Sequence, residues 1–196
     1  MTNRIKVLGI NIDPLTMRET VDTVEQYVLG KRALHLMGVN ADKINQCHTD
    51  EKIKKIVNDS GIINADGASV VLASKFLGTP VPERVAGIDL MQSLLELSNN
   101  KGYSVYFFGA KEEVLQDMLK AFKNDYPNLI VVGHRNGYFS ADDEQDIQED
   151  IREKNPDFVF VGITSPKKEY IIQKFMDNGV NSVFMGVGGS FDVLSG

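Results

Sequence analysis

Two residues whose side chains could carry out a reaction lie near each other in the sequence, Asp66 and Arg84. The apolar residues Ile62 and Ile63 shortly precede Asp66, so we expect its carboxylate where a short buried strand ends. Ligands of α/β sheets bind at that end of the strands. An aspartate there could accept a proton, hold a sugar hydroxyl or bind a metal. The alternative is structural, because Asp also favours Asx-turns and helix N-caps, here of a helix over residues 68–76.

Arg84 lies in a loop that contains Pro80 and Pro82. A guanidinium held on such a loop suits the oxygens of a diphosphate or a carboxylate. Two structural alternatives stay open for it. One is an ion pair with Glu83, and the other is a contact with backbone carbonyls that fixes the loop.

Three turns that follow expected strands could hold a phosphate. Gly109 and Ala110 form a strand–turn–helix junction that can set backbone N–H groups against a phosphate, and a plain tight turn explains them equally well. Lys167 and Lys168 open a helix, where they oppose the helix dipole and could meet a diphosphate. Residues 185–192 include three glycines, which would let a ligand approach the backbone; the alternative is a flexible end.

The elements that must position these residues alternate between apolar runs and helical patterns. Residues 5–10 are expected to form a strand or one arm of a hairpin. Further strands are expected over residues 33–39, 62–65, 103–108, 129–132, 158–162 and 182–187. Helices are expected over residues 17–29, 41–47, 51–57, 68–76, 87–99, 112–124, 141–153 and 166–178. This alternation predicts an α/β fold, with a parallel sheet, right-handed crossovers and helices on both faces.

Composition and charge narrow the class of protein. A chain of 196 residues is most simply one domain, and 42% hydrophobic with 24% charged residues is ordinary for a soluble globular protein. The net charge of −6 argues against non-specific nucleic-acid binding. The single cysteine, Cys47, excludes an internal disulfide and fits a reducing cytosol. The sequence shows no signal peptide and no apolar run of transmembrane length, so we expect a cytoplasmic location.

Motifs of other functional classes are missing from the sequence. His35, His48 and His134 lack the spacing of metal ligands. There is no nucleophile elbow or P-loop, and the absent glycine fingerprint disfavours an NAD-dependent oxidoreductase. The residues alone therefore predict an α/β domain whose cleft is lined by Asn40, Asp66, Arg84 and several glycine-rich turns, with a nucleotide-type phosphate ligand.

A set of motifs running in order along the chain carries a family resemblance. They are Asn40, Asp66-Gly67, residues 82–90, Phe108-Gly109-Ala110, Gly137-Tyr138-Phe139, residues 165–169 and residues 185–192. Together they resemble the WecG/TagA/CpsF family of bacterial glycosyltransferases from about Ile5 to Gly196. The stretches ERVAGIDL and MGVGGSFDV are the specific parts of the match.

The resemblance implies a Rossmann-like single domain over residues 1–196 and an inverting, metal-independent transfer without a cofactor. The donor would be a UDP-sugar and the acceptor an undecaprenyl-diphosphate-linked sugar. The best-known members add N-acetylmannosamine in wall teichoic acid synthesis, a part of cell wall biogenesis. Asp66 would be the general base, and Arg84 would stabilise the charge that builds on the leaving UDP. The expected substrate-binding residues are Asn40, Gly67, Gly109, Ala110, Lys168, Glu169, Gly186, Gly188, Gly189, Ser190 and Asp192.

Two departures from the family pattern concern the substrate. Many members have Thr-Pro-Asn where this chain has Gly38-Val39-Asn40, and Lys-Gln-Glu where it has Lys167-Lys168-Glu169. The donor could instead be UDP-glucose or carry an aminouronic acid. A different class of protein also stays open, a non-catalytic nucleotide-binding protein in which Asp66 and Arg84 are structural.

The resemblance also bears on location and assembly. Family members continue past the position of Gly196 with a basic, aromatic-rich tail, so we expect a truncated chain. Through that tail the enzyme would bind the inner face of the cell membrane as a peripheral protein. Apolar helix surfaces near Met91 could form a homo-oligomer interface.

Overall fold

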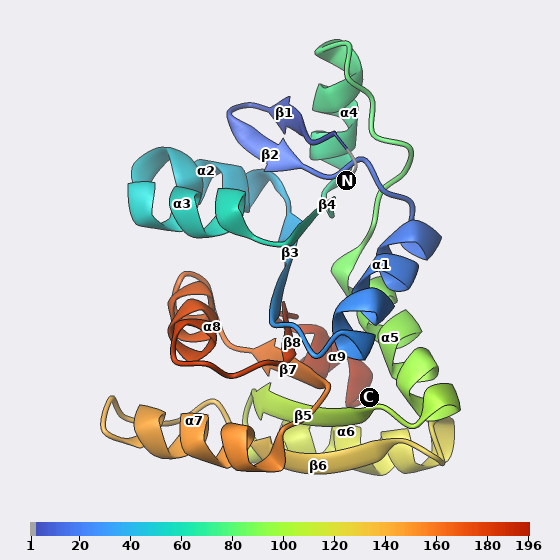
Figure 1. Ribbon diagram of the computed structural model, residues 1–196, viewed down its shortest axis with the longest axis vertical. Coiled ribbons are helices and arrows are strands. Elements are labelled where there is room, and N and C mark those ends of the chain that lie inside the picture. The colour runs from blue at the N-terminus through green and yellow to red at the C-terminus, as the bar shows by residue number, and fades with distance from the viewer. Residues whose placement is uncertain (1–2) are drawn as a thin grey trace.

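Six parallel strands form the central sheet of the computed structural model, which describes residues 3–196 (Figure 1). They are β3 (Leu34–Val39), β4 (Ile62–Ala65), β5 (Ser104–Gly109), β6 (Ile130–Arg135), β7 (Phe158–Gly162) and β8 (Val183–Gly186). Their spatial order is β4-β3-β8-β7-β5-β6, and every neighbouring pair is parallel. This sheet, with helices on both faces, confirms the predicted Rossmann-like α/β class.

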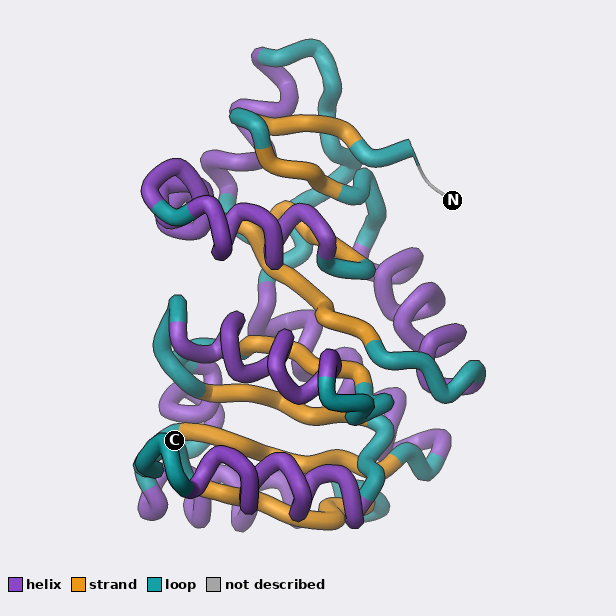
Figure 2. Tube along the Cα trace, turned by 60° about the vertical axis from the view of Figure 1, so that its left-hand side comes forward, coloured by secondary structure: helices purple, strands orange, loops and turns teal. Residues whose placement is uncertain are grey.

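Helices cover both faces of the sheet, as the two ribbon views show (Figures 1 and 2). The helices α1 (Met17–Leu29), α5 (Gly87–Lys101), α6 (Glu112–Asp125) and α9 (Ser190–Leu194) lie on one face. On the other face lie α2 (Ala41–Thr49), α3 (Glu51–Asp59), α7 (Asp143–Lys154) and α8 (Lys167–Asp177). The helix α4 (Ala68–Phe76) packs on β4 and on the hairpin at the β4 edge of the sheet.

Successive strand residues point to opposite faces, and this places them in different cores. In β3, Leu36 belongs to the core under α1 and α5, whereas its neighbour Met37 belongs to the core under α2 and α3. Such strands are buried on both faces, which explains why their sequences are almost continuously apolar.

The first expected strand is a two-stranded hairpin, β1 (Ile5–Val7) and β2 (Ile10–Ile12). Leu8 and Gly9 both have positive φ, 50° and 83°, so they form the kind of two-residue turn that joins twisted antiparallel strands. The hairpin leads to Asp13, which bonds to the edge strand β4. The Asp13 N–H donates to the Ile63 carbonyl at 2.8 Å, and the Ile63 N–H donates to Asp13 Oδ2 at 2.7 Å.

Other expected boundaries differ by a few residues. The strand β6 runs to Arg135 rather than to residue 132, and α7 begins at Asp143 rather than at 141. The Ser140 N–H donates to the Asp143 carboxylate at 2.7 Å, so residues 140–143 form a turn before the helix. The possible flexible end after β8 is a short helix, α9. No helix in residues 3–196 is long and apolar enough to cross a membrane.

Candidate active site

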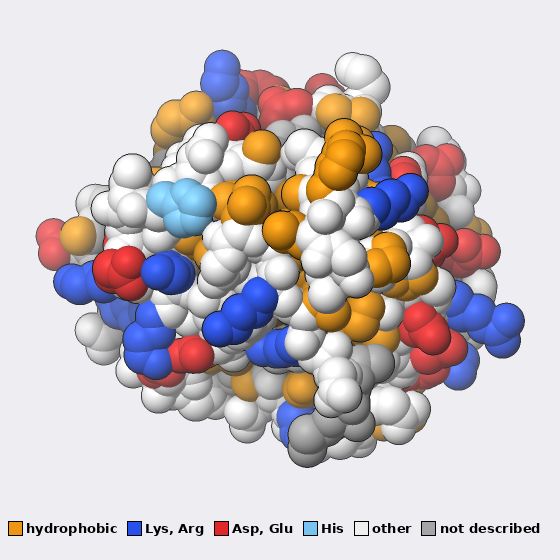
Figure 3. Space-filling view, turned by 90° about the horizontal axis from the view of Figure 1, so that it is seen from above, with side chains coloured by type: hydrophobic (Ala, Val, Ile, Leu, Met, Phe, Trp, Pro, Cys, Tyr) orange, Lys and Arg blue, Asp and Glu red, His pale blue; other side chains and the backbone are white. Residues whose placement is uncertain are grey.

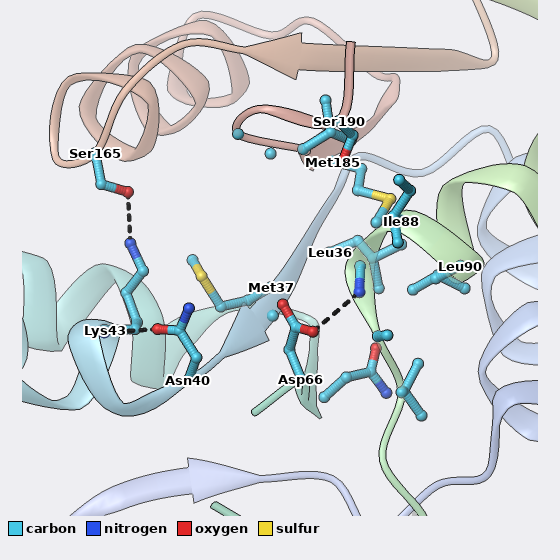
Figure 4. A pocket seen from close by; sticks show the side chains of 18 of the residues that line it. Leu36, Met37, Asn40, Lys43, Asp66, Ile88, Leu90, Ser165, Met185 and Ser190 are labelled. Atoms are coloured by element: carbon cyan, nitrogen blue, oxygen red, sulfur yellow. Dashed lines mark hydrogen bonds between the residues drawn. The ribbon is translucent and has the colours of Figure 1, made fainter. Parts of the chain in front are cut away.

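A cleft of about 450 Å³ opens at the carboxyl ends of β3, β4 and β8, and Asp66 lies in it (Figure 4). Its Oδ1 accepts a hydrogen bond from the N–H of Gly87, the first residue of α5, at 3.1 Å. Asp66 therefore does not cap the helix over residues 68–76. The N-cap of that helix is Gly67, and it makes no side-chain capping bond. The other carboxylate oxygen, Oδ2, has no hydrogen-bond donor within residues 3–196, which leaves it for a ligand.

Arg84 lies beside Asp66 because its loop is attached to the end of β4. The Val85 N–H donates to the Ala65 carbonyl at 2.9 Å, and Arg84 Nε donates to the Asp66 carbonyl. Arg84 Nη2 lies 3.9 Å from Asp66 Oδ1. The contact with a backbone carbonyl suggested by the sequence is therefore present, whereas Glu83 binds the N–H of Met17 instead. More than half of the Arg84 side chain stays exposed and lines the cleft.

Asn40 and Gly38 line the cleft beside Asp66, whereas Gly67 does not line it and packs against Asn40. Asn40 caps α2, with its Oδ1 accepting from the Lys43 N–H at 2.9 Å, so its Nδ2 is the atom left to donate to a ligand. A Cβ on Gly67 would lie 3.0 Å from the Asn40 Cα, and a Cβ on Gly38 would lie 3.3 Å from Asp66 Oδ2. Glycine at these positions lets the strand ends and the carboxylate approach one another.

Lys168 and Glu169, adjacent in α8, have different surroundings. The Lys168 side chain is 16% exposed and lines the cleft beside Gly186, with its Nζ 3.9 Å from Glu169 Oε1. Burial lowers the pKa of the Lys168 ammonium, and the negative charge of Glu169 offsets part of this effect. The Glu169 side chain is only 1% exposed and does not line the cleft, so it is placed to support the site rather than to contact a substrate.

Behind the cleft, Glu169 is held by two partners that the sequence analysis missed. Lys43 Nζ donates to Glu169 Oε1 at 2.6 Å and to Ser165 Oγ at 2.8 Å, while Ser165 Oγ donates to Glu169 Oε1 at 2.8 Å. Burial would raise the pKa of the Glu169 carboxyl, but the charges of Lys43 and Lys168 and these hydrogen bonds hold it below its ordinary value. Lys43 lies 126 residues from Glu169 in sequence, so no local pattern signals the pair.

The glycine-rich turn after β8 joins the cleft to a second hollow. Gly186, Gly188 and Ser190 line the cleft, while Gly188, Gly189 and Asp192 line the neighbouring hollow of about 430 Å³. The second hollow also includes Ala110 and Tyr138. Within residues 3–196, no oxygen accepts from the N–H groups of Gly188 and Gly189. These amides are therefore available to an anionic ligand that spans both spaces.

Gly109 and Ala110 form a tight turn whose backbone is already bonded. The Ala110 N–H donates to the Gly162 carbonyl at 3.0 Å, so this amide is not available to a phosphate. Gly109 has a φ of 138°, and a Cβ there would lie 2.3 Å from the Gly162 oxygen. Of the two interpretations, this geometry favours the structural turn, although Ala110 still lines the second hollow.

The structure does not bring Lys167 into the cleft. Its Nζ lies 3.8 Å from the centre of the Phe139 ring, so its charge makes a cation–π contact instead. Of the two lysines that were expected to meet a diphosphate, only Lys168 lines the cleft.

Across residues 3–196 there is also no group of three or more His, Cys, Asp or Glu side chains placed to hold a metal ion.

Comparison with known proteins gives consistent matches along the chain. The sequence model of the Glycosyl transferase WecG/TagA/CpsF family matches residues 5–196. Two relatives are from Staphylococcus aureus strains NCTC 8325 / PS 47 and MRSA252, and both are named N-acetylglucosaminyldiphosphoundecaprenol N-acetyl-beta-D-mannosaminyltransferase. Each is 32% identical over 197 aligned residues, which cover 100% of this chain and 77% of the relative.

Proposed function

The chain belongs to the WecG/TagA/CpsF family of glycosyltransferases, and from this membership and the cleft geometry we propose its reaction. It transfers N-acetylmannosamine from a UDP-sugar to an undecaprenyl-diphosphate-linked N-acetylglucosamine, with inversion at the anomeric carbon. The observation that carries the proposal is the placement of Asp66. One carboxylate oxygen is bound to Gly87, and the other is available in a cleft that three cationic residues line. They are Arg84, Lys168 and Lys43, of which Lys43 is paired with Glu169.

Asp66 acts as the general base. Its Oδ2 takes the proton from an acceptor hydroxyl while that oxygen forms a bond to the anomeric carbon of the donor. The bond between the anomeric carbon and the β-phosphate oxygen breaks, and UDP leaves with the bonding electrons. The proton stays on Asp66 until solvent removes it, so the step balances without a further reactant. Nδ2 of Asn40 is placed to hold a sugar hydroxyl.

The leaving diphosphate is stabilised by groups of this chain, without a metal ion. Lys168 and Arg84 supply positive charge, and the N–H groups of Gly188 and Gly189 supply hydrogen-bond donors. A cation kept in a largely buried site interacts more strongly with a developing charge than one in water does. Since Lys168 replaces the glutamine of many members, this chain has one more positive charge at the diphosphate.

The second hollow suits the nucleoside of the donor. Tyr138 is exposed and offers an aromatic ring for a base to stack on, and Asp192 offers an acceptor for a base N–H or a ribose hydroxyl. Both hollows meet at Gly188, where the diphosphate would lie. The donor thus spans the carboxyl ends of β5, β7 and β8, and its sugar reaches Asp66.

A donor that carries a carboxylate is the second candidate, and Lys168 is the observation that favours it. Its ammonium could bind an aminouronic acid as well as a diphosphate. Turnover should therefore be measured with UDP-N-acetylmannosamine, its uronic acid, UDP-N-acetylglucosamine and UDP-glucose, on a short-chain lipid-diphosphate acceptor. Transfer from UDP-N-acetylmannosamine supports the proposal. If transfer occurs only from another UDP-sugar, that sugar is the donor instead of N-acetylmannosamine. If there is neither transfer nor UDP binding, the cleft is not a UDP-sugar site.

A further inference from the structure

The segment between Asp66 and Arg84 leaves the body of the protein and returns to it. The helix α4 begins at Ala68, two residues after Asp66, and the loop after α4 comes back at Arg84. Its far end lies beside the β1–β2 hairpin, at the end of the molecule opposite β6 (Figure 1). We call residues 3–12 and 68–82 together the tip.

The tip exposes large apolar side chains. The sequence of α4, ASVVLASKF, is apolar nearly all round, which is typical of a helix covered on all sides. Yet only Val70 and Ser74 of α4 are buried. Phe76 is 84% exposed and Leu72 55%, and Leu77 and Leu8 are also more than half exposed. The space-filling view of this end shows hydrophobic side chains gathered next to lysines and arginines (Figure 3).

The charges of the tip are all positive. Its two segments contain Arg4, Lys6 and Lys75 and no Asp or Glu, on a chain whose net charge is −6. Arg4 is paired with Asp13. Lys6 and Lys75 are exposed, and within residues 3–196 neither makes a salt bridge or a side-chain hydrogen bond. The tip therefore combines exposed apolar groups with cationic groups, in contrast with the acidic remainder of the protein.

This combination fits an anionic membrane surface better than a second copy of the chain. Amphipathic elements that lie on bilayers place apolar side chains at the headgroup boundary and lysines against lipid phosphates. In a symmetric pairing of two tips, the same cationic surface would face itself, and like charges would oppose contact.

We propose that the tip rests on an anionic phospholipid bilayer, with Leu8, Leu72, Phe76 and Leu77 entering the headgroup region. The inference rests in part on the proposed function, whose acceptor is lipid-linked. The nine residues of α4 span about 14 Å at 1.5 Å per residue. Asp66 and Arg84, at the base of the tip, would then lie about one such helix length from the membrane, within reach of a sugar joined to a lipid by a diphosphate.

The test is co-sedimentation of the 196-residue chain with vesicles of phosphatidylglycerol and, separately, of phosphatidylcholine. We expect binding to phosphatidylglycerol vesicles that weakens with added salt. The double variant L72S/F76S should bind at least tenfold more weakly, and K6E/K75E should lose the preference for the anionic lipid. The matched control is L29S/I130S, which removes two exposed apolar side chains from other surfaces and should bind like the unchanged protein.

Three results would overturn the proposal. They are no binding to phosphatidylglycerol vesicles, equal binding by L72S/F76S at an unchanged melting temperature, or a dimer in sedimentation that L72S/F76S dissociates without any vesicle binding. Titration of the same proteins with UDP keeps the two proposals apart. Vesicle binding without UDP binding would support membrane binding by the tip and refute the proposed donor site. UDP binding without vesicle binding would support the donor site and refute membrane binding by the tip.

Discussion

The carboxylate of Asp66 is fixed by the backbone N–H of Gly87, which donates to its Oδ1 at 3.1 Å. Gly87 opens α5, so the carboxylate lies at a helix N-terminus, where negative charge is favoured. A side chain on Gly87 would approach the carboxylate, since a Cβ there would lie 3.4 Å from Asp66 Oδ2. Oδ1 of Asp66 therefore has a structural role, because it is held by the Gly87 N–H, whereas Oδ2 is left to accept a proton.

The two roles of Asp66 predict different effects for two substitutions. Asp66→Asn keeps an oxygen for the Gly87 N–H but cannot accept a proton, so turnover should fall about 10²–10⁴-fold at an unchanged melting temperature and UDP affinity. Asp66→Ala should also lose about 1–3 kcal/mol of stability, because it leaves that N–H unpaired. Activity assays and thermal melts measure both. Unimpaired turnover by Asp66→Asn would contradict the assignment of the base.

Adjacent lysines provide a matched test of the diphosphate site. Lys168→Gln should weaken UDP binding by about ten- to a hundredfold, because a hydrogen bond to a charged group contributes about 1.5–3 kcal/mol. Lys167→Gln removes the same charge from a side chain that lies over Phe139, and should leave UDP affinity nearly unchanged. Isothermal titration without added divalent metal measures both. Equal losses in the two variants would indicate a general effect of charge rather than a contact.

The buried pair of Lys43 and Glu169 should show strong coupling. Glu169→Gln leaves the Lys43 ammonium buried without its counter-charge and should cost about 3–5 kcal/mol of unfolding free energy. Adding Lys43→Met should recover much of that loss, because neither charge then remains. Urea denaturation of the single and double variants gives the coupling energy. Additive losses would mean that the pair is not a unit.

His35, which is buried in β3, should make the protein less stable as the pH falls into the acid range. Burial lowers the pKa of its imidazole from 6.5 to about 4. The unfolded chain thus binds a proton that the folded chain refuses between those values, and stability falls as pH falls through this window. The loss from pH 7 to pH 5 should be about 2 kcal/mol. His35→Leu should remove this part of the slope, whereas the exposed His134→Leu should retain it, and denaturation at each pH decides.

Gly109 should tolerate no side chain. Its φ of 138° and the 2.3 Å between a Cβ and the Gly162 oxygen predict a loss of about 3 kcal/mol or more for Gly109→Ala. Gly179 also has positive φ, 86°, but nothing lies within 4 Å of its Cβ position. Gly179→Ala should therefore cost only about 1–2 kcal/mol, from backbone conformation alone. Similar melting temperatures for the two variants would refute the steric argument.

The sequence predicted most of the fold because its strands are strongly apolar and its helices have regular apolar spacing. It also predicted that Asn40, Asp66 and Arg84 line one cleft, since strand ends meet at one edge of a parallel sheet. The partner of Asp66 was not predictable, because Gly87 contributes only a backbone N–H. Glu169 was expected to contact substrate, but its carboxylate is buried against the Lys43 ammonium. Because Lys43 is distant in sequence and comes near only through tertiary packing, the sequence did not indicate this pairing.

The bonds of Asp13 have a consequence for how sheets of this protein could associate. An edge strand with open N–H and carbonyl groups recruits strands from other chains. On the outer side of β4, both polar groups of Ile63 are bonded to Asp13, and the Ala65 carbonyl accepts from Val85. The β4 edge is therefore closed to strand addition. Within the six-stranded sheet, aggregation through edge pairing, for instance during concentration for crystallisation, would begin at β6, the opposite edge.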